Sequence, residues 1–91
     1  MKKNSYTEFT VSGTQEAFVL VCDGKERLIS SKEAKMLSLK LKQILGSNIS
    51  NYDILISRQL LVGGNDTEML LIKRETALRA WYFFKRALKI M

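Results

Sequence analysis

The first apolar pattern along the chain has a period of two. Thr7, Phe9 and Val11 alternate with the more polar residues between them, which is typical of a strand with one solvent-exposed face. A continuous apolar run follows at 17–22, and the turn sequence CDGKE separates it from a shorter strand over 27–30. We therefore predict a β-hairpin that is preceded by an edge strand over 7–12.

The second half of the chain repeats this order. Strands are expected over 52–62 and 67–73, with the turn sequence VGGND between them. A shift of 43 residues brings 18–45 onto 61–88 and leaves seven identical positions. This self-similarity predicts an internal duplication of a strand-strand-helix unit.

The duplication defines the domain organisation that we expect. The pseudo-repeats run over about 11–46 and 54–89. A chain of 91 residues is long enough for one compact domain and too short for two, so residues 1–91 are predicted to form a single domain.

Apolar residues at the helical period predict two amphipathic helices. The first is expected over 31–45, opened by a capping box of Ser30 and Glu33 and closed by Gly46. Its apolar stripe comprises Ala34, Leu37, Leu41, Ile44 and Leu45. The stripe of the second helix comprises Ala77, Ala80, Trp81, Phe84, Ala87, Leu88 and Met91. The expected fold class is thus α+β, an antiparallel sheet with two helices on one face.

The predicted strands carry apolar side chains on both faces. Because two helices cover only one face of so small a sheet, the other face is left without a covering layer. This uncovered face is expected to hold Val19, Val21, Leu55, Met69 and Leu71. We therefore predict a homodimer that buries the sheet face against a second copy.

Composition supports a packed core and a reducing compartment. The chain is 46% hydrophobic and 26% charged, which is typical of globular proteins. Its one cysteine, Cys22, lies in an apolar run where a reduced, buried thiol is expected, and this favours a cytoplasmic location. No apolar segment approaches the roughly 20 residues of a membrane span, so no membrane association is expected.

The net charge of +6 is concentrated at one end of the chain, because residues 73–91 carry six basic side chains and one acidic side chain. On the second helix, the residues opposite the apolar stripe fall within about 120° of one another. This basic face comprises Arg79, Tyr82, Lys85, Arg86 and Lys89. Trp81 and Phe84 are expected to point inward.

The start of the second helix carries two further cations, Lys73 and Arg74. Positive charge at a helix N-terminus opposes the macrodipole, and neither side chain provides a cap. A bound phosphate would neutralise the positive charge and would accept hydrogen bonds from the uncapped backbone N–H groups. The alternative is that Glu75 compensates the charge and that both cations are solvated.

Missing residue types exclude several classes of function. The chain has no histidine and a single cysteine, so neither a zinc site nor histidine-based catalysis is expected, and no enzyme, metal or cofactor is predicted. No motif for reading a nucleic-acid sequence is present. We predict a non-enzymatic nucleic-acid-binding or regulatory protein that recognises charge and shape through Lys73, Arg74 and the basic face. The alternative is a protein-binding adaptor or inhibitor, of the phage or mobile-element type, that targets an acidic partner surface.

Overall fold

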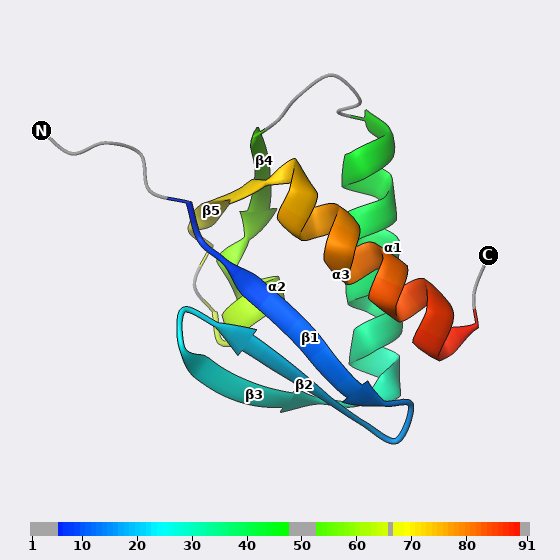
Figure 1. Cartoon of the computed structure of the whole chain (residues 1–91). Coiled ribbons are helices and arrows are strands. Elements are labelled where there is room, and N and C mark those ends of the chain that lie inside the picture. The colour runs from blue at the N-terminus through cyan, green and yellow to red at the C-terminus, as the bar shows by residue number, and fades with distance from the viewer. Residues whose placement is uncertain (1–5, 48–52, 66, 90–91) are drawn as a thin grey trace, which may run out of the picture.

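The computed structural model describes residues 6–47, 53–65 and 67–89 (Figure 1). The elements in chain order are β1 (Phe9–Thr14), β2 (Ala17–Cys22), β3 (Lys25–Ile29), α1 (Ser31–Ser47), β4 (Asp53–Ser57), α2 (Arg58–Val62), β5 (Met69–Lys73) and α3 (Arg74–Leu88). The strands form two antiparallel sheets, one in the order β1-β2-β3 and one that pairs β4 with β5. The α+β class is confirmed, whereas the single sheet that we expected is divided in two.

The predicted hairpin and edge strand are confirmed in the three-stranded sheet. β1 pairs only with β2 in this sheet, and the β2–β3 turn closes at Cys22 and Lys25. Asp23 and Gly24 occupy the two turn positions with φ of 51° and 82°, which is the geometry that suits a tight hairpin. The pleat turns Phe18 and Leu20 into the core, where both are fully buried.

Residues 58–62 were expected to extend a strand, and this prediction is wrong, because they form α2. Ser57 provides the cap, since its Oγ accepts a hydrogen bond of 3.2 Å from the backbone N–H of Gln59. Gly63 ends the helix at φ 91° and donates its N–H to the carbonyl of Gln59. The short apolar run 60–62 has no period that separates strand from helix, whereas Ser57 and Gly63 provide the two ends of a helix. Tyr52, where the strand was expected to begin, lies outside the described residues.

The duplication of a complete strand-strand-helix unit is not confirmed. β3 and α1 do recur as β5 and α3, and the first helical residues, Ser31 and Arg74, are 43 positions apart. The positions offset by 43 from β2 are 60–65, and they hold the end of α2 and a glycine turn instead of a strand.

The capping box of α1 is confirmed. The Ser30 Oγ accepts the N–H of Glu33, and Glu33 Oε1 accepts the N–H of Ser30, both at 3.2 Å. The predicted end is wrong, because α1 continues two residues beyond Leu45, through Gly46 to Ser47. Gly46 does not adopt a positive φ, so it does not break the helix.

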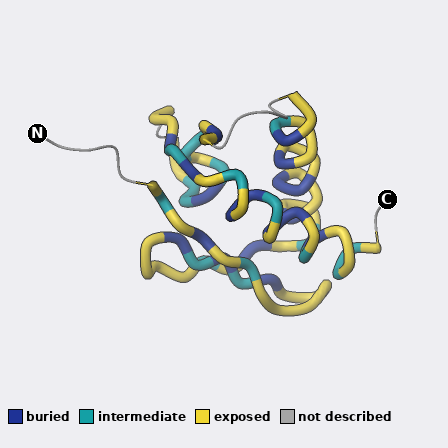
Figure 2. Tube along the Cα trace, turned by 45° about the horizontal axis from the view of Figure 1, so that its top comes forward, coloured by how far each residue is buried: buried dark blue, intermediate teal, exposed yellow. Residues whose placement is uncertain are grey.

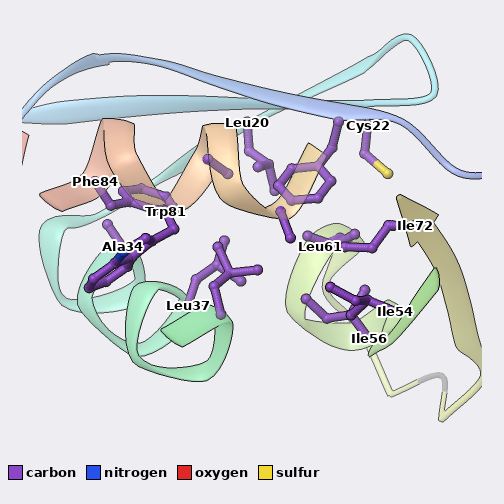
Figure 3. Packing of buried hydrophobic residues seen from close by; sticks show 14 of the residues in the cluster. Leu20, Cys22, Ala34, Leu37, Ile54, Ile56, Leu61, Ile72, Trp81 and Phe84 are labelled. Carbon is purple, nitrogen blue, oxygen red and sulfur yellow. The ribbon is translucent and has the colours of Figure 1, made fainter. Parts of the chain in front are cut away.

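One hydrophobic core joins both sheets and both long helices. α3 crosses α1 and also packs against β1, β4 and β5 (Figure 1). Buried segments of the trace line the interior, and exposed segments lie outside (Figure 2). Leu20, Leu37, Ile54, Ile72 and Phe84 come from five different elements and belong to one cluster of buried side chains (Figure 3). Of the predicted stripe residues, Ile44, Ala87 and Leu88 are only partly buried, and Met91 lies outside the described residues.

Candidate functional site

α3 has a buried face and a charged face, as its sequence predicts. Trp81 is 9% exposed and Phe84 is fully buried. The Phe84 ring meets Phe18 edge-on with 5.6 Å between centroids, so this face binds the helix to the three-stranded sheet. The Lys42 Nζ lies 6.0 Å from the Trp81 ring centre, which places Lys42 at the junction of α1 and α3.

The opposite face of α3 is exposed along its whole length. Arg79, Tyr82, Lys85 and Arg86 are exposed, and Lys89 follows directly after the helix and is also exposed. Residues three or four positions apart are neighbours on a helix surface, so the phenol of Tyr82 stands between Arg79 and the pair Lys85 and Arg86. Tyr82 is 53% exposed, which makes its ring accessible to a partner.

Some of the cations on this face of α3 also make interactions within the protein. Arg79 pairs with Glu75 at 3.2 Å, but both side chains are more than half exposed, so the pair stabilises the helix only weakly. Lys85 and Arg86 occupy the last turn of α3, where positive charge complements the macrodipole. Lys89 adopts a left-handed conformation and donates its N–H to the Lys85 carbonyl, so it ends the helix.

The two cations at the start of α3 contact other parts of the protein. Arg74 donates from Nη2 to the Leu45 carbonyl at 3.3 Å, and so satisfies the carboxyl end of α1. Lys73 forms the N-cap without a side-chain hydrogen bond, and its Nζ lies 5.2 Å from the centre of the Tyr6 ring. The structure therefore brings five of the seven predicted site residues onto one face and places Lys73 and Arg74 elsewhere.

Sequence reasoning missed a polar cluster around Tyr6. The Tyr6 hydroxyl donates to Asp53 Oδ1 at 2.5 Å, and this hydrogen bond raises the pKa of Tyr6 above its ordinary value of 10.0. Asp53 is in turn the cross-strand partner of Lys73. No local signal in the sequence connects Tyr6 with Asp53, because 47 residues separate them.

A recess lies between the β2–β3 turn and α2. It has a volume of ≈ 370 Å³, and its lining includes Cys22, Arg27, Arg58 and Leu61. Burial raises the pKa of the Cys22 thiol, which keeps the sulfur protonated and weakly nucleophilic. This environment suits a packing residue better than a nucleophile.

Two further observations apply to the described part of the chain. It contains no group of three or more histidine, cysteine, aspartate or glutamate side chains placed to hold a metal ion. Within the same residues, no helix has the length and apolar character needed to cross a membrane.

Comparison with known protein families, curated proteins and solved structures found no match to this chain. The basic face of α3, defined as Arg79, Tyr82, Lys85, Arg86 and Lys89, is thus the candidate site on physical grounds.

Proposed function

We propose that this protein binds nucleic acid through the basic face of α3 and acts as a non-enzymatic regulatory protein. One observation carries the proposal. The face presents four exposed cations around an exposed tyrosine, and Glu75 is the single acidic residue of the helix. Phosphates attract the cations, and the tyrosine ring offers a surface for stacking with a base.

The buried face of α3 supports this proposal because it fixes the helix in place. Trp81 and Phe84 hold the helix in the core, so the binding face is presented by a rigid element and not by a loop. Phosphate contacts from such a face carry little sequence information, so recognition by charge and shape is expected.

The test is binding of labelled single-stranded and duplex oligonucleotides, measured by fluorescence anisotropy at several salt concentrations. The logarithm of the affinity should fall linearly with the logarithm of salt concentration, with a slope of about −0.7 to −0.9 per phosphate contacted. Replacing Lys85 and Arg86 together by Glu should weaken binding at least tenfold at about 50 mM salt, because two attractive contacts become repulsive. The core stripe is untouched, so the folded state should persist.

The matched control replaces Lys32 and Lys40 of α1 by Glu. Both residues are exposed, and both double variants lower the net charge from +6 to +2. Lys42 is unsuitable for this purpose because it lies over Trp81. Equal losses in the two variants would show that net charge alone drives binding and would refute a site on α3.

The same experiment separates the main alternative, an adaptor or inhibitor that binds an acidic protein surface through this face. A protein of that kind would bind neither oligonucleotide at about 50 mM salt. The proposal of nucleic-acid binding would then be abandoned.

We also propose that the protein works in a reducing compartment and as a homodimer. The buried free thiol of Cys22 supports the first statement. The five apolar residues predicted for the dimer face lie on two sheets, Val19 and Val21 on β2 and Leu55, Met69 and Leu71 on the β4–β5 sheet. Leu55 and Met69 are more than half exposed, so the two-stranded sheet supports self-association most strongly.

A further inference from the structure

The hydrogen bonds around β5 reveal which edge of the two-stranded sheet is open. The carbonyl of Leu71 accepts the N–H of Thr7 at 2.8 Å, so it points away from β4. In an antiparallel ladder, two opposed residues either exchange both hydrogen bonds or direct their backbone groups to opposite sides. Leu71 is opposite Leu55, and the N–H and C=O of Leu55 therefore point to the outer edge of β4.

The other sheet edges are each protected within the chain. β1 lies against α3, and the Gln15 side chain also donates to the Ala87 carbonyl. β3 carries Lys25, Glu26 and Arg27, and charged residues discourage pairing with another strand. The outer edge of β5 is bonded to Thr7.

β4 is less protected among the described residues, because Asp53 is its one charged side chain. Its sequence, DILIS, contains no lysine and no proline, and it pairs with β5 residue for residue without a bulge. No hydrogen bond from the described chain reaches the outward backbone groups of Leu55. Buried backbone groups are almost always paired, so these unpaired groups indicate a solvent-accessible edge.

We propose that β4 pairs antiparallel with β4 of a second copy, around a twofold axis at Leu55. The two Leu55 residues would exchange both of their outward hydrogen bonds, and β5-β4-β4-β5 would become one continuous four-stranded sheet. This proposal goes beyond nucleic-acid binding and does not depend on it.

The edge is self-complementary in this register. Asp53 lies opposite Ser57 of the second copy, so each carboxylate meets a hydroxyl donor and not another carboxylate. A twofold axis at Asp53 would instead place the two carboxylates directly opposite each other, which is destabilising.

The same pairing brings the exposed apolar residues next to the edge into one continuous sheet face. Leu55 is 56% exposed, and it shares the outer sheet face with its cross-strand partner Leu71 and with Met69, which is 51% exposed. In the dimer the two Leu55 side chains stand side by side and join the two apolar rows. The pairing is isologous, so the open β4 edge of each copy is used in the same contact. The assembly therefore closes at two copies.

The test compares Leu55→Lys with Leu39→Lys by sedimentation equilibrium without nucleic acid. The two leucines are 56% and 62% exposed, so both substitutions should leave the fold intact and add the same charge. Wild type and Leu39→Lys should give about twice the monomer mass of 10.4 kDa at roughly 100 μM. Leu55→Lys should weaken the dimer at least tenfold, because the two lysines lie opposite each other.

Leu55→Pro tests the backbone contact itself. Proline removes the N–H that faces outward and leaves the hydrogen bonds to β5 in place, so a monomer is expected. Emission from Trp81, the one tryptophan, shows whether the core remains folded. If Leu55→Pro unfolds, the result for Leu55→Lys tests the proposed β4–β4 pairing. A monomeric wild type, a dimer that survives Leu55→Lys, or equal dissociation of Leu39→Lys would each overturn the proposal.

Discussion

Individual arginine residues of this protein have structural roles that formal charge does not reveal. Arg27 donates to the carbonyls of Leu60 and Leu61 at 3.1 and 3.4 Å, at the carboxyl end of α2. Arg74 makes the same kind of contact with α1 through Leu45. The guanidinium group suits this purpose because it carries five donors and keeps its charge. These two cations are therefore weaker candidates for a partner than the exposed cations of α3.

Because of Tyr6, the free energy of unfolding should change with pH in the alkaline range. Its hydrogen bond to Asp53 raises the pKa in the folded state above the ordinary value of 10.0, so folding favours the protonated phenol. This contribution is complete below about pH 10 and is lost as the pH rises through the raised pKa. The difference in unfolding free energy between wild type and Tyr6→Phe should be constant at neutral pH and should shrink at alkaline pH. Urea unfolding at several pH values measures this difference in unfolding free energy. A difference that is independent of pH would contradict a raised pKa of Tyr6 in the folded state.

Among the elements, the long amphipathic helices could be predicted and the short one could not. α1 and α3 each repeat apolar residues over several turns, which defines both the helix and its buried face. α2 spans five residues, and its short apolar run fits a strand equally well. The Ser57 cap and the Arg27 contacts identify it as a helix, and the second of these comes from a distant part of the chain.

At the junction of α1 and α3, Trp81→Ala should lower the unfolding free energy by about 3 to 5 kcal/mol, because it leaves a cavity where the indole is buried. Leu39→Ala is the control. Leu39 is 62% exposed on the outer side of α1, and its replacement should cost less than about 0.5 kcal/mol. Chemical denaturation measures both values. Similar small losses would mean that the indole does not fill the core.

At the scale of the whole molecule, the two sheets depend on a single core. Ile56 from β4, Leu20 from β2 and Phe84 from α3 belong to the same cluster of buried side chains. Ile56→Ala should therefore lower the unfolding free energy by about 2 to 5 kcal/mol for the entire protein and not for one sheet alone. Trp81 fluorescence and far-ultraviolet circular dichroism should report the same shifted transition. Separate midpoints would show that the sheets unfold independently.

What the sequence by itself determined is local. The period of apolar residues places Trp81 and Phe84 inside and Tyr82 outside, and the spacing of Ser30 and Glu33 determines the start of α1. These features depend on residues within one or two helical turns, where backbone geometry limits the possible neighbours.

The tertiary structure alone decided the division into two sheets, the internal contacts of Arg27 and Arg74, and the bond between Tyr6 and Asp53. It also decided that the outer edge of β5 is occupied, through the hydrogen bond from Thr7 to Leu71. These hydrogen bonds join residues that are 29 to 64 positions apart in the chain. The tertiary fold brings such distant residues together. No repeating pattern of residue types in the sequence predicts these contacts.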